Sequence, residues 1–194
     1  MTIKDYIEKN RTMRAIKRFN MEAVIHPQSL SCHGYGVGTL FYLLCTTKGV
    51  EITAEDLFMI MNHDFAETFT GDLNKQIKNH SIKTITAWEQ IEREILPSHL
   101  FPLSDEGLSM SLTNETYPLF LFSDAMEAWL YTSEEISKGN TCLVNAHAHY
   151  RNLLCKMILE FEKEKFFLQD KEEDKRQNWV MFLDYMKGEV GDGL

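Results

Sequence analysis

Histidine and carboxylate side chains are concentrated between residues 61 and 73, in the segment MNHDFAETFTGDL. His63 and Asp64 are adjacent, and Glu67 follows about one helical turn later on the same face. A helix that only packs has little use for three such groups so close together, whereas a metal site would use all of them. An isolated His-Asp pair also occurs on ordinary protein surfaces, so spacing alone leaves both interpretations open.

A divalent metal needs ligands from several helices, and two further residues are candidates because of their settings. His33 lies in the first turn of a predicted helix, just before its apolar stripe. Asp124 lies within LFLFSDAMEAWL, where a carboxylate without a partner would be costly to bury. A cation would remove that cost, and the alternative is a hydrogen-bonded aspartate in the core. Two histidines and two carboxylates suit zinc, manganese, iron or cobalt, and ligand type does not choose among them.

The elements that must position these residues are predicted to be helices, because apolar residues recur at helical spacing and no stretch alternates as a strand would. Of the six predicted helices, the first covers 2 to 18, the second runs from a Ser31 cap to Gly49, and the third begins with the capping box TAED at 53 to 56. The fourth covers 80 to 96, the fifth runs from an Asn114 cap to 138, and the sixth ends near 169. The segment GYGVG at 34 to 38 lacks the context of a phosphate loop and indicates tight helix packing. We therefore predict an all-α helical bundle, a single domain over 1 to 194 with a core from about 11 to 170 and a charged C-terminal tail.

The composition of the chain limits the classes of partner that it can bind. The chain has 194 residues, a hydrophobic content of 44% and a formal net charge of -9, so it should fold as a globule and bind neither nucleic acid nor an anionic membrane surface. Its four cysteines are scattered, its N-terminus lacks the apolar core of a signal peptide, and no apolar run reaches the ~20 residues of a membrane span. We expect a cytoplasmic protein that forms a homo-oligomer.

The order His33, then His63 and Asp64, then Asp124 resembles the H…HD…D signature of the HD-domain metal phosphohydrolases. The likeness narrows to the bacterial HD-type 5′-deoxynucleotidases through KRFNM at 17 to 21, SLSCH at 29 to 33, NHDFAETFTGDL at 62 to 73, Lys78, and SDA at 123 to 125. This resemblance covers residues 11 to 138. It implies an all-helical HD domain, one divalent transition metal and deoxynucleotide substrates.

The same resemblance suggests roles for five further residues. Glu67 would point at the attacking water or the leaving group, and Asp72, after the Thr-Gly turn, is the second acid-base or orienting candidate. Arg18 and Lys78 would neutralise phosphate oxygens, and Phe19 would stack on the base. Packing in the core is the alternative role for Phe19.

Three departures from the family pattern bear on substrate choice. Phe19 replaces a tryptophan, Ser-Cys-His at 31 to 33 replaces Ser-Glu-His, and Asn-Lys-Gln at 74 to 76 replaces a segment that contains proline. The first predicted function is hydrolysis of deoxynucleoside 5′-monophosphates to deoxynucleoside and phosphate. The alternatives are a deoxynucleoside triphosphohydrolase, similar to small phage HD proteins that convert dATP to deoxyadenosine and triphosphate, and a silent nucleotide-binding module. Intact Glu67 and Asp72 count against the silent module.

Overall fold

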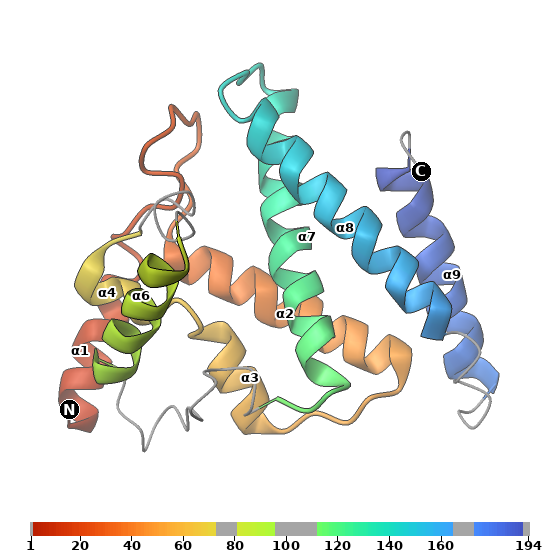
Figure 1. The fold of residues 1–194 in the computed structure, drawn as a ribbon, viewed down its shortest axis with the longest axis horizontal. Helices are drawn as coiled ribbons and strands as arrows, with labels where there is room; N and C mark the ends of the chain where they lie inside the picture. Colours follow the sequence, from red (N-terminus) through yellow and green to blue (C-terminus); the bar gives the residue numbers. More distant parts are fainter. Residues whose placement is uncertain (1, 73–80, 96–111, 165–172, 192–194) are drawn as a thin grey trace.

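The computed structural model describes residues 2–72, 81–95, 112–164 and 173–191. Within these ranges every regular element is a helix, and the predicted all-α fold is confirmed (Figure 1). The helices are α1 (Ile3–Thr12), α2 (Leu30–Lys48), α3 (Ala54–Met61), α4 (Glu67–Thr70), α6 (Ile82–Ile95), α7 (Thr116–Ser137), α8 (Val144–Glu164) and α9 (Glu173–Val190). No helix among the described residues is long and apolar enough to span a membrane.

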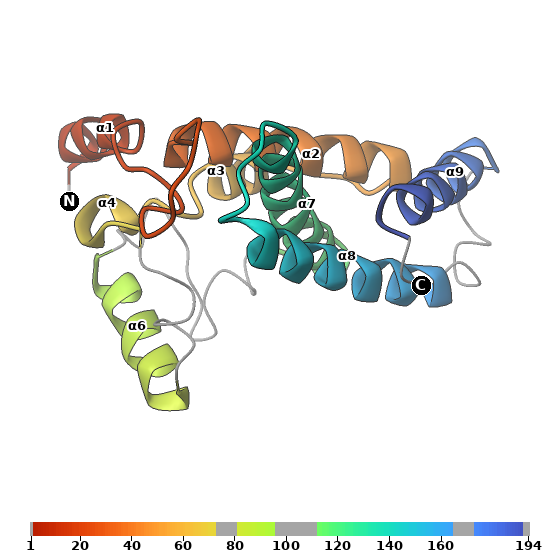
Figure 2. The ribbon, with the colours of Figure 1, turned by 90° about the horizontal axis from the view of Figure 1, so that it is seen from above.

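Helices α2 and α7 cross at the centre of the molecule, and α8 and α9 pack against this pair (Figures 1 and 2). The core between them is built from large side chains that are fully buried, such as Phe41, Leu119, Phe122, Leu154 and Trp179. Burial of each such side chain stabilises the fold by about 1.5–3 kcal/mol. A second, smaller cluster of Met13, Leu30, Phe65 and Ala66 fixes α1 and α4 beside the start of α2.

The helix ends follow local chemistry, with two corrections to the predicted caps. The hydroxyl of Ser29, not Ser31, caps α2 by accepting the N–H of Cys32, because residue 29 has the extended backbone of a cap and residue 31 is already helical. Asn114 does not cap α7, since the Thr113 hydroxyl accepts the N–H of Thr116 at 3.1 Å. The predicted capping box at the start of α3 and the left-handed Gly49 at the end of α2 are confirmed.

The first helix ends at Thr12, so the prediction that it reaches residue 18 is wrong. The chain turns after Met13, which is buried, and residues 16 to 18 pair with the segment before α2. Arg18 N–H donates to the Gln28 carbonyl at 2.9 Å, and Leu30 N–H donates to the Ile16 carbonyl at 3.0 Å. These bonds replace helical ones and place Arg18 and Phe19 on a loop beside α2.

The core extends past the boundary near residue 170 that the sequence predicted. The described part of the charge run, residues 173 to 177, is mostly exposed, as expected. Beyond it, Trp179, Leu183, Met186 and Val190 recur at helical spacing and are fully buried against α2 and α8. The C-terminal segment is therefore a core helix with a charged first turn rather than a charged tail.

Candidate metal centre

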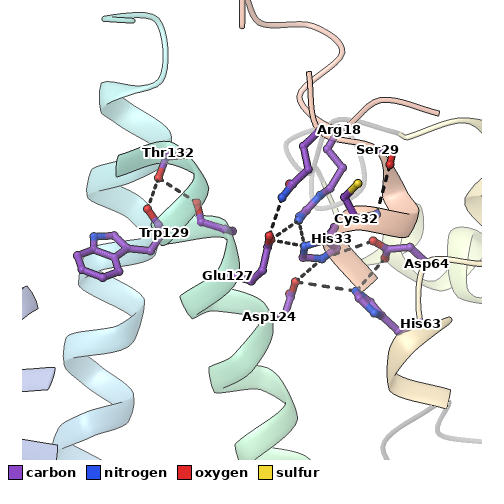
Figure 3. Close-up of polar contacts among 12 residues, drawn as sticks. Arg18, Ser29, Cys32, His33, His63, Asp64, Asp124, Glu127, Trp129 and Thr132 are labelled. Carbon is purple, nitrogen blue, oxygen red and sulfur yellow. Dashed lines mark hydrogen bonds and ion pairs between the residues drawn. The ribbon is translucent and has the colours of Figure 1, made fainter. Parts of the chain in front are cut away.

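Three elements bring four predicted ligands together at one point (Figure 3). His33 comes from the first turn of α2, His63 and Asp64 from the turn that follows α3, and Asp124 from the middle of α7. His33 Nε2 lies 3.0 Å from Asp124 Oδ1 and 3.7 Å from Asp64 Oδ2, while His63 Nε2 lies 3.3 Å from Asp64 Oδ1 and 3.9 Å from Asp124 Oδ1. One ligand atom from each of His33, His63 and Asp64 lies within 4.8 Å of the others.

Both imidazoles turn their Nε2 atoms toward this point. His63 Nδ1 donates to the Ile60 carbonyl oxygen at 2.7 Å, which assigns the lone pair to Nε2. His33 Nδ1 makes short contacts with both Glu127 Oε2 and Arg18 Nη1. Since Arg18 Nη1 also donates to Glu127 Oε2, which can only accept, we assign the Nδ1 hydrogen to His33 as a second donor to the same carboxylate. His33 Nε2 is buried and lies 3.0 Å from Asp124 Oδ1, but the two atoms do not have the geometry of a hydrogen bond. A lone pair that faces carboxylate oxygens is repelled unless a cation lies between them, so the donor set fits a divalent metal.

The surroundings keep the cluster charged and accessible from one side. The His33 side chain is 0% exposed, whereas the Asp64 and Asp124 side chains are 22% and 23% exposed, so solvent reaches the carboxylate side. Burial works to raise the pKa of Asp64, but His63, His33 and Arg18 outweigh it and leave that pKa lowered. The lowered pKa keeps Asp64 ionised, which is the form that binds metal.

Arg18 and Phe19 lie beside the cluster on the loop before α2. Arg18 is buried, and its guanidinium lies 3.4 Å from Glu127 Oε2. Burial works to lower the pKa of Arg18, but Asp124 and Asp64 raise it further, so the guanidinium stays charged. Phe19 has a φ of 54°, stacks on Tyr131 with ring centroids 5.4 Å apart, and has the Arg18 guanidinium 5.6 Å from its centroid. The stack shows that at least part of the role of Phe19 is packing.

Of the three remaining predicted site residues, two lie within the described part of the chain. Glu67 is buried at the start of α4, and its N–H donates to the Asp64 carbonyl at 3.0 Å. Asp72 is half-buried, and its backbone oxygen accepts a 2.6 Å hydrogen bond from the Asn20 side chain, which links it to the loop of Arg18. Lys78 and residues 74 to 76 lie outside the described residues.

Two residues beside the cluster, Glu127 and Gln28, are not predicted from the sequence. Glu127 lies three residues after Asp124, and its carboxylate reaches both His33 and Arg18, while the Gln28 amide donates to its other oxygen at 2.6 Å. A second carboxylate on the same apolar helix face as Asp124 was a usable signal, because burial demands partners for both.

A third carboxylate of α7, Glu135, fixes the loop that carries Arg18 and Phe19. Glu135 is buried and accepts the N–H groups of Ile25 and His26 at 2.6 and 2.8 Å, together with the Asn140 amide at 2.8 Å. The Asn140 amide also donates to the Ala23 carbonyl at 2.8 Å. Side chains of α7 and of the turn after it therefore hold the backbone of this loop in place.

Two glycines of the GYGVG segment allow α3 to pack directly on α2. A methyl group at Gly34 would overlap the backbone carbonyl of Met61, and one at Gly38 would meet the Met61 side chain at 2.5 Å. Met61 ends α3, and His63 and Asp64 follow it. The predicted tight packing is confirmed, and it brings the His63 turn against the helix that carries His33.

A helical bundle in which the first turn of one helix, a His-Asp turn and an aspartate of a later helix converge defines an HD-domain protein. The family model described as 5′-deoxynucleotidase YfbR-like matches residues 5–173, and the chain belongs to this family. A 5′-deoxynucleotidase of Yersinia pseudotuberculosis is 28% identical over 158 residues, which cover 73% of this chain and 79% of that protein. A 5′-deoxynucleotidase of Photorhabdus laumondii is 28% identical over 144 residues, which cover 66% and 72%.

Solved structures share the fold at lower identity. An HD-domain phosphohydrolase from Listeria innocua has a TM-score of 0.66 and 20% identity, with 98% of each chain covered. The cyanophage S-2L HD phosphohydrolase DatZ, solved with dA and one catalytic Zn²⁺ ion, has a TM-score of 0.58 and 19% identity, with 93% of this chain and 96% of that chain covered. Both likenesses concern the fold.

Proposed function

We propose that the protein is a metal-dependent phosphohydrolase that converts deoxynucleoside 5′-monophosphates to deoxynucleosides and inorganic phosphate. The observation that carries this proposal is the meeting of His33, His63, Asp64 and Asp124 with both Nε2 atoms directed at the two carboxylates. Membership of the YfbR-like family and the names of the curated relatives support a deoxynucleoside monophosphate as substrate.

These four side chains would hold one divalent transition metal. When bound, the metal would polarise the phosphate and lower the pKa of the attacking water. The zinc ion of the cyanophage DatZ structure supports zinc as the first candidate. Manganese, cobalt and iron suit the same donors, and metal analysis of the purified protein separates them.

Arg18, Phe19 and Lys78 would bind the substrate. The charged Arg18 guanidinium beside the cluster suits a phosphate, because an arginine can bond two phosphate oxygens at once. The family resemblance implies that Lys78 would be a second phosphate ligand. Phe19 is the candidate for stacking on the nucleobase, and its contact with Tyr131 supports packing as a parallel role.

Glu67 and Asp72 would move protons during the reaction. The burial of Glu67 three residues after Asp64 supports it as the group that takes a proton from water or gives one to the leaving oxygen. The hydrogen bond from Asn20 to the Asp72 backbone supports a place for Asp72 near the loop of Arg18.

A deoxynucleoside triphosphohydrolase that releases triphosphate is the second candidate. The altered segment at 74 to 76 favours it, since Lys75 would add a cation for a longer phosphate chain. The dA in the cyanophage DatZ structure suits either candidate, because deoxyadenosine is a product of both reactions. The site residues are the same for both candidates.

Product analysis separates the two candidates. The purified protein would be loaded with Mn²⁺, Co²⁺ or Zn²⁺ and incubated with each dNMP and each dNTP, and the products would be separated by chromatography. We expect deoxynucleoside and phosphate from dNMPs, with a higher kcat/KM than for dNTPs. Triphosphate from dATP as the main product would overturn the first candidate in favour of the second.

We also propose that the protein works as a homo-oligomer in the cytoplasm. Free thiols at all four cysteines support a reducing compartment. An exposed stripe of Tyr35, Tyr42 and Leu43 on α2 supports an interface between copies. Light scattering after gel filtration would test the oligomer, and a monomer at all concentrations would contradict it.

A further inference from the structure

Glu127 contacts two functional groups that come from different parts of the chain. It is buried on α7, where Oε2 makes a short contact with His33 Nδ1 and lies 3.4 Å from Arg18 Nη1 (Figure 3). Its other oxygen, Oε1, accepts the Gln28 amide at 2.6 Å. Both oxygens of the carboxylate are therefore engaged, and the side chain is held in one orientation.

The backbone of α2 leaves room for this carboxylate. A methyl group at Gly36 would lie 2.9 Å from Glu127 Cγ and 3.2 Å from Oε1, closer than side chains normally approach. Gly36 comes three residues after His33, so the space that it leaves lies next to the imidazole. The middle glycine of the GYGVG segment thus admits Glu127, whereas the first and the last admit Met61.

We propose that Glu127 is a positioning residue that couples the metal site to the phosphate-binding arginine. By accepting the Nδ1 hydrogen, it directs the His33 Nε2 lone pair at the metal position. By facing the Arg18 guanidinium, it orients the group proposed to bind the phosphate. This inference rests on the proposed function for the role of Arg18, whereas the role toward His33 needs only that the site binds metal.

The physical basis is the low tolerance of a buried site for unsatisfied groups. Without the carboxylate, His33 Nδ1–H would be buried with no ionised acceptor, and the ring could turn its lone pair away from the metal. The loss of a hydrogen-bond partner of a metal-binding histidine typically weakens metal affinity by about 10–100-fold. Arg18 would lose the anion that orients it, so the KM for the substrate should rise as well.

The test compares Glu127→Gln with Glu134→Gln by metal binding. Glu134 lies on the same helix, but its side chain is 63% exposed and pairs with Lys138. Metal-free protein would be titrated with Zn²⁺ against a coloured chelator, with circular dichroism and melting curves to verify folding. We expect a Kd for Zn²⁺ that is about 10–100-fold weaker in Glu127→Gln and unchanged in Glu134→Gln. A folded Glu127→Gln protein with the Kd of the original protein would overturn the proposal.

A second variant keeps the proposal testable if Glu127→Gln does not fold. Gln28→Met removes the hydrogen bond to Glu127 Oε1 without touching His33 or the charge of Glu127. A positioning role predicts weaker Zn²⁺ binding in this variant, whereas a merely structural role predicts a lower melting temperature with unchanged Kd. If the unaltered protein binds Zn²⁺ but hydrolyses no deoxynucleotide, the proposed function fails while these Kd comparisons still decide the role of Glu127.

Discussion

The imidazole of His33 lies between two carboxylates of one helix, with Nε2 3.0 Å from Asp124 Oδ1 and Nδ1 in contact with Glu127. If Nδ1 carries the only hydrogen of a neutral ring, Nε2 and Asp124 present lone pairs to each other. Either a second proton or a metal ion must lie between them. The addition of His63 and Asp64 at the same point makes a metal the occupant that uses all four groups.

Loss of one ligand should empty the site. We expect His63→Ala and Asp64→Ala each to lose nearly all bound divalent metal and all phosphohydrolase activity, because the three remaining donors hold the ion far more weakly. Elemental analysis of the purified variants measures this directly. Asp184→Ala, a change at an exposed aspartate of α9, is the control and should keep its metal. Full metal content in both ligand variants would end the four-ligand account.

Glu67 should be needed for turnover but not for metal binding. We expect Glu67→Ala to keep the metal and bind nucleotide, yet to turn over substrate at least about 100-fold more slowly, which is the usual scale for a lost acid-base group. Metal content and single-turnover rates on the same sample test both halves. Near-normal turnover would assign proton transfer to Asp72 or to the water alone.

The glycine at position 34 should be needed for the packing of α3 on α2. Because a methyl group there would overlap the Met61 carbonyl, Gly34→Ala should lower the free energy of unfolding by about 1–3 kcal/mol. Gly188→Ala in α9 is the matched control, since no atom of the described residues outside the backbone of its own helix lies within 4 Å of the added methyl, and it should be neutral or stabilising by about 0.5–1 kcal/mol. Equal effects of the two changes in urea unfolding would contradict this account of the glycines.

Glu135 should make the stability of the protein depend on pH. Burial works to raise the pKa of Glu135, but the Asn140 amide and the N–H groups of Ile25 and His26 lower it below its ordinary 4.5. A lowered folded-state pKa adds stability above the unfolded value, and this stability is lost as the pH falls through the folded value. Glu135→Gln should therefore cost about 1.5–3 kcal/mol at neutral pH, and the cost should shrink in acid below the ordinary pKa.

The control for Glu135 is its exposed neighbour on α7. Glu134→Gln should change stability by about 0–1 kcal/mol, because its pair with Lys138 is open to solvent. Unfolding in urea across the acidic range would measure both variants. A cost for Glu135→Gln that does not vary with pH would show that the carboxylate charge is not what holds the loop.

Local signals in the sequence predicted much of the fold. The spacing of Val37, Phe41 and Leu44 predicted α2, and the Thr53 capping box predicted the start of α3, because both depend only on residues within a few turns. The cap of α2 was misplaced because both Ser29 and Ser31 are good capping residues, and only the backbone conformation separates them. The final helix was missed because charged residues surround its buried stripe.

Only the site residues that belong to a linear sequence motif could be predicted. His63 and Asp64 are adjacent in sequence, and the order of His33 and Asp124 around them is itself a signature. Glu127 is not part of that signature, and its role depends on how α7 lies across α2, which no local pattern specifies. The space left by Gly36 for Glu127 depends on the same crossing of the two helices.

Hydrolysis of a deoxynucleoside monophosphate should require a divalent metal at the cluster of His33, His63, Asp64 and Asp124. The most direct measurement is to remove the metal from the protein, add Zn²⁺ or Mn²⁺ back in steps, and follow phosphate release from dAMP. The account predicts no turnover in the metal-free protein and a rate that rises in proportion to added metal until each chain holds one ion. Full turnover by the metal-free protein, or none after the metal is bound, would contradict it.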